Sequence, residues 1–343
     1  MHFSSYHMDM GYLRKTATII SLLAILTACQ FSLTPIKSQG VEPTIQSSII
    51  QDKNPSFLEP TSYASPSPTT TKSKPSTITP YPSIVFGVIG DYGSGDERER
   101  LVSQLVTSWK PDLIITSGDN NYPLGEYGTI DVNIGQFYQE YIGNYKGTFG
   151  NGSDENRFFP SMGNHDWLTD DANPYFDYFE LPGNERYYFF SWNYIDFFAL
   201  NSDGHEPDGF ISDSIQGKWL REHLAVSTGV WKIVYFHHAP YTSGYHSSSV
   251  WMQWPFQEWG ADLVISGHSH VYERLEINGL IYIVNGLGGG VIYDFVDILP
   301  ESLLRYNQDH GALRITGNQD QLKCQFMNTA GDIIDDFTLS KTH

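Results

Sequence analysis

Two apolar runs that each lead into a Gly-Asp pair constrain the fold of this chain more than any other feature. The first run, residues 84–89, precedes Asp91. The second, residues 113–115, precedes Asp119. Neither run alternates between apolar and polar residues, which is typical of strands buried on both faces of a sheet. Because open α/β sheets bind ligands at the carboxyl ends of their strands, the two carboxylates are predicted to lie together at such an edge.

The segment between these runs is predicted to be an amphipathic helix. Apolar residues recur there at helical spacing, at Leu101, Val102, Leu105, Val106 and Trp109. Ser94 and Glu97 are predicted to form a capping box at its start, and Pro111 is predicted to end it. The result is a strand–helix–strand unit with an aspartate at the carboxyl end of each strand.

Other metal-liganding side chains also follow predicted strands. Three more strands lead into such residues: 158–162 into Asn164, 231–236 into His237, and 261–266 into His268 and His270. Strands are further predicted at 187–192, 195–200, 281–285, 312–315, 322–328 and 332–339, and a helix at 216–224. This pattern indicates an α/β domain whose site is built on the ends of rigid strands.

Tyr122 adds an unusual ligand to this set, because it follows Asp119 by three residues and few metal sites include a phenolate. Hard carboxylate and phenolate oxygens suit a trivalent ion such as Fe(III), whereas imidazole and amide groups suit a softer divalent ion such as Zn, Mn or Fe(II). Two ions roughly 3.5–4 Å apart can clamp the attacking and leaving oxygens of a phosphoryl transfer. The alternative is that the aspartates cap turns and that Tyr122 packs on the surface.

Five short blocks each contain a metal-liganding side chain: GDYG at 90–93, GDNNY at 118–122, GNHD at 163–166, VYFH at 234–237 and GHSH at 267–270. In their order and spacing, these blocks resemble those of the calcineurin-like metallophosphoesterases. The tyrosine that closes the second block narrows the resemblance to the purple acid phosphatases. The resemblance covers residues 84–290 and, more weakly, the segment up to Leu339. It implies a four-layer α/β/β/α sandwich with two packed mixed sheets, which hydrolyses phosphomonoesters with a metal-bound hydroxide.

The resemblance also implies a role for each residue of the site. The implied ligands of Fe(III) are Asp91, Asp119, Tyr122 and His270, with Asp119 bridging the two ions. The implied ligands of the second ion, which is Fe, Zn or Mn, are Asn164, His237 and His268. His165 is implied to bind the substrate phosphate or to protonate the leaving group. His246 stands where plant members of the family have a histidine pair that contacts substrate, although here Ser247 replaces the second histidine.

Neighbouring residues are predicted to support the site without binding metal. His238 follows His237, so its side chain points the other way along a strand and is predicted to pack or to support the ligands. Asp166 is predicted to orient the ligands. Residues 286–290 are predicted to form a glycine turn near the site, since they lack the Lys-Ser/Thr of a nucleotide-binding loop.

Two other functions remain open at this point. A Mn- or Zn-dependent phosphodiesterase of the same superfamily, including one acting on cyclic nucleotides, would not require Tyr122. A surface-anchored binding protein without activity could keep the fold, but the loss of at least one ligand would mark it. No block lacks its ligand, and hydrolysis is therefore the favoured interpretation.

The first 82 residues are predicted to export and tether this domain. Arg14 and Lys15 precede an uncharged run that ends in Leu-Thr-Ala before Cys29. This pattern is typical of a lipoprotein signal peptide, at residues 1–28, with Cys29 as the lipid-anchored residue; the alternative is an ordinary signal peptide. Residues 29–82 are predicted to be a Ser/Thr/Pro-rich tether and residues 83–343 the metallophosphoesterase domain. We therefore expect a membrane-anchored protein of the cell envelope, in the periplasm or at the cell surface.

Charge and cysteine content limit the partners of the chain. The formal net charge of −19 disfavours nucleic acid and anionic membrane surfaces as partners. A small phosphoester substrate would therefore depend on a local positive centre such as a metal cluster. The two cysteines, Cys29 and Cys324, exclude a disulfide framework, and Cys324 is predicted to be buried.

Overall fold

The structure is a computed structural model, and it describes residues 83–341. The predicted signal peptide and tether, residues 1–82, lie outside the described residues, so the lipid anchor on Cys29 stays a prediction. Within the described range, no helix is both long enough and apolar enough to cross a bilayer.

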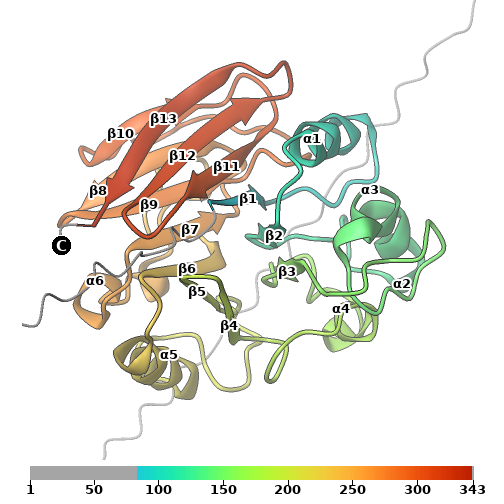
Figure 1. Ribbon diagram of the computed structural model, residues 1–343, viewed down its shortest axis with the longest axis horizontal. Coiled ribbons are helices and arrows are strands. Elements are labelled where there is room, and N and C mark those ends of the chain that lie inside the picture. The colour runs from blue at the N-terminus through green and yellow to red at the C-terminus, as the bar shows by residue number, and fades with distance from the viewer. Residues whose placement is uncertain (1–82, 342–343) are drawn as a thin grey trace, which may run out of the picture. The chain divides into compact units, whose positions relative to one another are not determined.

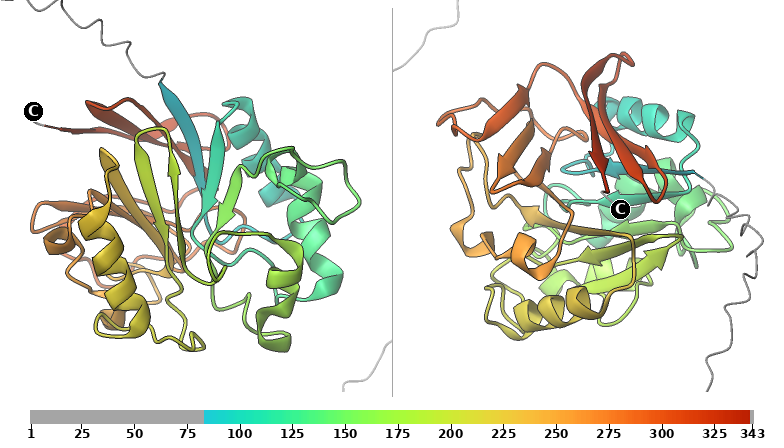
Figure 2. Two further views of the ribbon diagram at one scale, coloured as in Figure 1. Left: turned by 60° about the horizontal axis from the view of Figure 1, so that its bottom comes forward. Right: turned by 60° about the vertical axis from the view of Figure 1, so that its left-hand side comes forward.

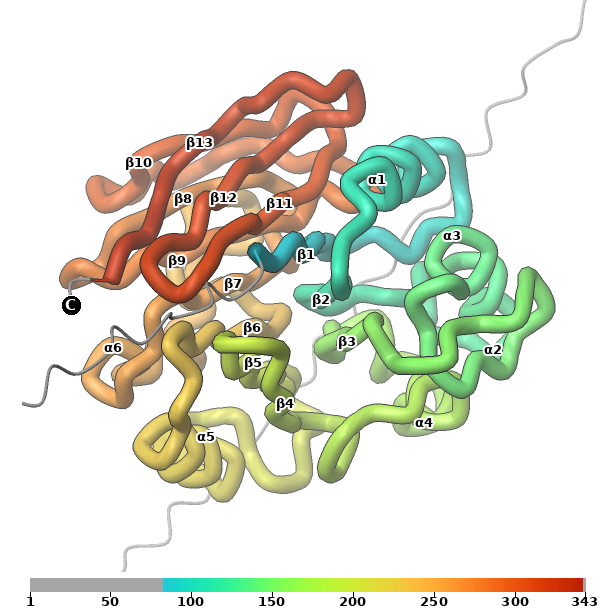
Figure 3. The backbone as a smooth tube through the Cα atoms, viewed as in Figure 1, coloured from blue at the N-terminus to red at the C-terminus, as the bar shows by residue number. Residues whose placement is uncertain are grey.

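The first of two sheets contains the strand–helix–strand unit that the sequence predicts. Its six strands follow the order β13-β12-β11-β1-β2-β3. Their bounds are β1 Ile84–Ile89, β2 Leu113–Thr116, β3 Phe158–Pro160, β11 Gly311–Gly317, β12 Gln321–Asn328 and β13 Ile333–Ser340. β1, β2 and β3 are parallel, whereas β11 runs antiparallel to β1. Figure 3 shows β1 and β11 side by side although they are far apart in sequence.

The second sheet has seven strands in the order β10-β8-β9-β7-β6-β5-β4. Their bounds are β4 Tyr188–Trp192, β5 Ile195–Ala199, β6 Trp231–His238, β7 Leu263–Gly267, β8 Tyr272–Ile277, β9 Leu280–Asn285 and β10 Ser302–Tyr306. β5, β6, β7 and β9 are parallel. β4 pairs antiparallel to β5 at one edge, β8 pairs antiparallel to β9, and β10 at the other edge pairs antiparallel to β8. Both sheets are therefore mixed.

Helices cover the outer faces of the two sheets (Figures 1 and 2). The helices are α1 Glu97–Ser108, α2 Tyr127–Ile130, α3 Gln136–Tyr138, α4 Asn173–Tyr178, α5 Ile215–Val226 and α6 Phe256–Trp259. The first four flank the six-stranded sheet, and the last two flank the seven-stranded sheet. The predicted fold of two packed mixed sheets between helices is confirmed.

The pleat of each inner strand divides its side chains between two cores. On β5, Phe197 belongs to the core between the sheets, where its ring meets Phe86 of β1 edge-on at 5.2 Å. Its neighbour Phe198 faces the other way and packs in the core beneath α5. A partly buried ion pair also links the sheets, since Arg274 Nε of β8 donates to Asp335 Oδ2 of β13 at 2.7 Å.

The start of α1 differs from the predicted capping box of Ser94 and Glu97. The N-cap is Asp96, whose side chain accepts a hydrogen bond from Arg98 N. Glu99 reaches back instead of Glu97, and its Oε2 accepts from Gly95 N at 2.7 Å. The physical reason is Gly95, whose φ of 67° is left-handed and prevents the helix from starting before Asp96.

Burial of Glu99 leads to a prediction about pH and stability. Burial raises the pKa of this carboxyl well above its ordinary value of 4.5. Above that value the folded chain keeps a proton that the unfolded chain has released, so this site weakens folding as pH rises. We expect Glu99→Gln, which keeps the acceptor for Gly95, to stabilise the chain more at pH 8 than at pH 5. Urea unfolding at both pH values measures the difference.

The matched control is Glu97→Gln, which changes an exposed carboxylate on the same turn of α1. Glu97 pairs with Arg100, and this hydrogen bond lowers its pKa, so the sign of its contribution is reversed. The prediction is wrong if Glu99→Gln gives the same stability change at both pH values.

Candidate metal centre

The seven predicted ligands follow or end five strands whose carboxyl ends converge, three parallel strands of one sheet and two of the other. They are Asp91 after β1, Asp119 and Tyr122 after β2, Asn164 after β3, His237 at the end of β6, and His268 and His270 after β7. The six-stranded sheet thus supplies mainly oxygen donors, and the seven-stranded sheet supplies the imidazoles. The donors divide in this way because the blocks with Asp, Tyr and Asn follow strands of the first sheet, and the blocks with the three ligand histidines end or follow strands of the second.

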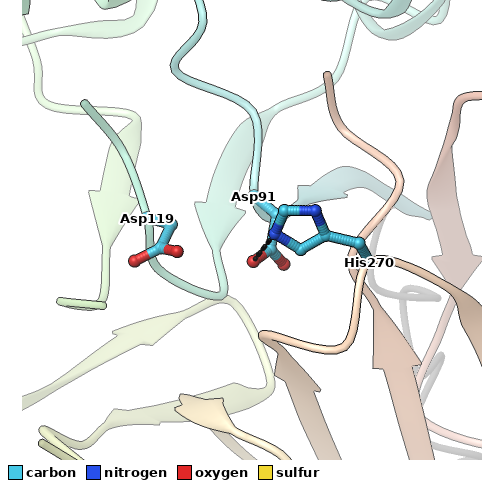
Figure 4. Close-up of side chains that lie close together, drawn as sticks. All are labelled: Asp91, Asp119 and His270. Atoms are coloured by element: carbon cyan, nitrogen blue, oxygen red, sulfur yellow. Dashed lines mark ion pairs between the residues drawn. The ribbon is translucent and has the colours of Figure 1, made fainter. Parts of the chain in front are cut away.

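Asp91, Asp119 and His270 form a compact group of donors (Figure 4). Their ligand atoms all lie within 4.8 Å of one another, and all three residues are buried. His270 Nε2 faces Asp91 Oδ1 at 3.2 Å. Two carboxylates and one imidazole at this spacing can hold a single cation.

The hydroxyl of Tyr122 lies at the centre of this group. It is 2.9 Å from Asp119 Oδ2, 3.0 Å from His270 Nε2 and 3.4 Å from Asp91 Oδ1. Burial and the charges of Asp119 and Asp91 raise the pKa of Tyr122 well above its ordinary value of 10.0. The phenol therefore stays protonated between these carboxylates unless a cation offsets their charge.

A second group of donors surrounds His237 Nε2. That atom is 3.0 Å from Asn164 Oδ1 and 3.1 Å from His268 Nδ1. It is also 3.4 Å from Asp119 Oδ1. Asp119 therefore contacts both groups, one through each carboxylate oxygen, as a bridging ligand must.

Backbone carbonyls fix which ring nitrogen each histidine can present. His237 Nδ1 lies 2.8 Å from the carbonyl of Ser117, and His270 Nδ1 lies 2.6 Å from that of Val291. Each Nδ1 is thereby assigned as the donor, which leaves Nε2 as the free lone pair. In both rings Nε2 is the nitrogen that faces the other predicted ligands.

The electrostatics of the cluster call for added positive charge. Burial alone would lower the pKa of His237, but the charge of Asp119 outweighs it and raises the pKa to about 10. Burial and the nearby charge of His237 lower the pKa of His268, which stays neutral. Without a metal ion, a proton on His237 partly neutralises the charge of Asp119. A metal cation would replace that proton, so the donor set fits a cationic centre.

The backbone around the ligands adopts conformations that few residues tolerate. Asp91, Asp119, His268 and His270 have φ values of 55°, 53°, 69° and 44°. Left-handed conformations at residues with a side chain cost free energy and cluster at functional sites. Gly290 lies against this backbone, where an added Cβ would be 2.7 Å from His270 Cε1. The predicted glycine turn thus gives His270 the space it occupies.

Two predicted supporting residues contact the ligand loops as expected. Asp166 accepts hydrogen bonds from Gly163 N at 2.8 Å and from Asn120 N at 3.1 Å, so it ties the second and third blocks together. Burial and the charge of Asp119 raise the pKa of Asp166 to about 6. The ring of His238 packs beside that of the predicted ligand His268, with 4.5 Å between the ring centres, and its Nδ1 lies 3.0 Å from Ser202 Oγ.

Both predicted substrate-contacting histidines lie beside the cluster. The backbone N of His165 donates to Asp119 Oδ1 at 3.0 Å, and its ring packs edge-on against Tyr122 at 4.6 Å. His165 Nδ1 lies 2.6 Å from the carbonyl of Pro123, which leaves Nε2 toward the site. His246 is exposed, and its ring centre is 4.4 Å from that of His268. The geometry brings both to the site, and their roles stay predictions.

A cleft of about 270 Å³ opens beside the cluster. Tyr122, His165 and His270 line it, and so do three residues that the sequence reasoning missed: Ser94, Arg98 and Tyr293. Arg98 lies in a Glu-Arg-Glu-Arg run that looks like an ordinary charged helix face. Tyr293 lies in an irregular segment after the glycine turn. Neither has a local sequence signal that separates it from surface residues.

Comparisons with known proteins agree with this geometry. Residues 84–272, which are 189 of the 343 residues, match the family of calcineurin-like phosphoesterases. Purple acid phosphatase 17 of Arabidopsis thaliana is 24% identical over 295 residues, and the alignment spans 76% of this chain and 85% of that protein.

Two solved structures share the fold at low identity. A purple acid phosphatase from seeds of yellow lupin, Lupinus luteus, superposes with a TM-score of 0.62 at 17% identity, covering 76% of this chain and 54% of that one. GAP50, described as the anchor in the inner membrane complex of Plasmodium, superposes with a TM-score of 0.60 at 18% identity, covering 76% and 90%. At such identities the superpositions show a shared fold and nothing more.

Proposed function

Because this chain belongs to the family of calcineurin-like phosphoesterases, whose members are hydrolases with a binuclear metal centre, we propose that it is a phosphomonoesterase of the purple acid phosphatase type. The observation that carries the proposal is the position of the Tyr122 hydroxyl, within 3.4 Å of donor atoms of Asp91, Asp119 and His270. A phenol held among carboxylates is suited to a trivalent ion, whereas a purely divalent centre has no need of it.

The proposed metals follow from the two donor groups. Asp91, Asp119, Tyr122 and His270 would hold Fe(III), and Asn164, His237 and His268 would hold a divalent Fe, Zn or Mn, with Asp119 shared. When bound, such ions bind the phosphate oxygens and lower the pKa of water enough to supply a nucleophile in acid.

The remaining chemistry is assigned to side chains of the chain itself. His165 Nε2 is 4.0 Å from Asp119 Oδ2, and the ring lines the cleft. Its Nδ1 is assigned to the Pro123 carbonyl, so a protonated ring offers Nε2–H to a leaving-group oxygen in the cleft. Tyr122 packs on the ring and limits its rotation.

Replacing His165 by asparagine tests this assignment. We expect kcat to fall about 10²-fold for an alkyl phosphate, whose leaving group needs a proton, and much less for p-nitrophenyl phosphate, whose leaving group does not. His205→Asn is the control, because His205 is an exposed histidine outside the cleft. Equal losses on both substrates would contradict a role in leaving-group protonation.

The proposed activity is tested on the purified full-length chain loaded with iron and each candidate divalent ion. Metal analysis and a visible absorption spectrum come first, followed by hydrolysis of phenyl phosphate, bis(p-nitrophenyl) phosphate and a cyclic nucleotide. Faster turnover of the monoester in acid supports the proposal. A preference for either diester with Mn or Zn would overturn it, and so would the absence of turnover on all three.

We also propose that the chain is anchored in the cell envelope through a lipid on Cys29, which lies outside the described residues. Support comes only from the basic, apolar and small-residue pattern before that cysteine. Mass spectrometry of the mature N-terminal peptide tests it. An unmodified Cys29, or a cut elsewhere, contradicts the anchor without bearing on the catalytic proposal.

A further inference from the structure

Arg98 is the one lysine or arginine among the described residues that line the cleft beside the metal centre. We propose that Arg98 recognises a second anionic group, a carboxylate or another phosphate, on the leaving group of the phosphoester. The inference rests on the proposed function, since it assigns a class of substrate to the same site. Arg98 is then a specificity-determining residue that does not contact the reacting atoms.

The guanidinium of Arg98 is held in place from one side. Its Nε and Nη2 donate to Asp96 Oδ2 at 2.8 and 2.5 Å. Asp96 is fixed in turn, because its Oδ1 accepts from Ser94 Oγ at 3.0 Å and from Arg98 N at 2.9 Å. Burial opposes ionisation of Asp96, but the hydrogen bonds from Arg98 and Ser94 outweigh it and lower its pKa. The ion pair between Arg98 and Asp96 therefore persists in acid.

The other side of the guanidinium is available to a ligand. Within residues 83–341, Nη1 donates to no protein group, and 40% of the side chain is exposed. An arginine offers five N–H donors in a planar fork that matches a carboxylate or phosphate. Asp96 uses two of these nitrogens, so the fork keeps a free edge with its position already set.

With His165 as the proton donor, the leaving group of a bound ester enters this cleft. His165, the proposed proton donor to the leaving-group oxygen, lines the same cleft as Arg98. Tyr293 forms another part of the wall, with its ring stacked on His270 at 4.4 Å. An organic leaving group thus has an aromatic surface to pack on and Arg98 within the same cavity.

The charge of the surroundings makes Arg98 more selective. The chain carries a formal net charge of −19, so a substrate with an extra negative charge is repelled at long range. The free N–H groups of the Arg98 guanidinium offset that repulsion only for an anion that reaches them. We therefore expect a preference for leaving groups whose second anionic group reaches Arg98 when the phosphoryl group is at the metal centre. Negative charge elsewhere on the leaving group should give no preference.

Binding of non-hydrolysable phosphonates to the metal-loaded, full-length protein tests the inference by calorimetry. The first pair of probes is 4-carboxybenzylphosphonate and 4-carbamoylbenzylphosphonate, which share shape and differ in one charge. The second pair is methylenebisphosphonate and methylphosphonate. The first pair reports on a carboxylate and the second on a further phosphate. The variants are Arg98→Gln and, as a matched control, Arg100→Gln, which removes the same charge from an exposed pair with Glu97 on the same helix.

We expect the wild-type chain to bind the doubly anionic member of at least one pair about tenfold more tightly, the effect of one charge-assisted hydrogen bond. Arg98→Gln should lose that preference, whereas Arg100→Gln should keep it. The inference is overturned if the wild-type chain prefers neither anionic probe, or if both variants change the preference equally. Because these probes report binding alone, a chain that hydrolyses phenyl phosphate but shows no preference refutes this inference and not the proposed function. A chain that is inactive in the hydrolysis assay refutes the proposed function, whatever the probes show.

Discussion

Replacing Asp119 by asparagine is expected to remove both metal ions and nearly all activity. Asp119 contacts both donor groups, through Oδ2 to Tyr122 and Oδ1 to His237. An amide keeps the shape but carries no charge, so neither ion is balanced. We expect kcat/KM for phenyl phosphate to fall more than about 10³-fold, beyond the 10- to 100-fold typical of outer-shell partners. Kinetics and elemental analysis of the purified chain measure the two losses.

Two controls separate loss of the centre from loss of the fold. Asp154→Asn makes the same change of charge at an exposed loop position and should leave metal content and kcat/KM unchanged. Urea unfolding of metal-free protein should show that Asp119→Asn still folds cooperatively, since burial of a neutral amide costs less than burial of a carboxylate. If Asp119→Asn keeps both ions, Asp119 is not the bridging ligand.

The central strands and the ligand blocks were predictable because local sequence decides both. The residues of β1 are apolar without interruption, and a strand buried on both faces needs that composition. The blocks follow such strands directly, so their convergence is a consequence of parallel pairing. The sequence therefore predicts which side chains meet before any contact is known.

The sequence did not predict β8 and misplaced the start of α1, because both depend on contacts formed only in the folded chain. β8 contains Glu273, a buried carboxylate that no strand pattern predicts. It is accommodated because Ser243 donates to it from both N and Oγ, at 2.7 and 2.6 Å. These donors lie 30 residues away in the sequence, so only the fold shows them. The same holds for Arg98, whose place in the cleft depends on how α1 packs.

Replacing Tyr122 by phenylalanine is expected to abolish the visible absorption of the iron-loaded protein completely. The band of such a centre arises from charge transfer between a phenolate and Fe(III), and the ring of phenylalanine has no oxygen to donate. The two carboxylates that raise the pKa of Tyr122 also attract the cation that would deprotonate it. The substitution also removes the hydrogen bond to Asp119 at 2.9 Å. Absorption spectra at equal iron content measure the loss.

Tyr293→Phe is the matched control for this change, because Tyr293 lies in the same cleft and stacks on the ligand His270. Within residues 83–341 its hydroxyl has no hydrogen-bond partner, so its removal should leave the band unshifted. A band that survives in Tyr122→Phe but vanishes in Tyr293→Phe would move the ligand to Tyr293. A wild-type chain that is active and colourless with Mn or Zn would contradict the ferric site, because Tyr122 would then serve only as a hydrogen-bond donor to Asp119.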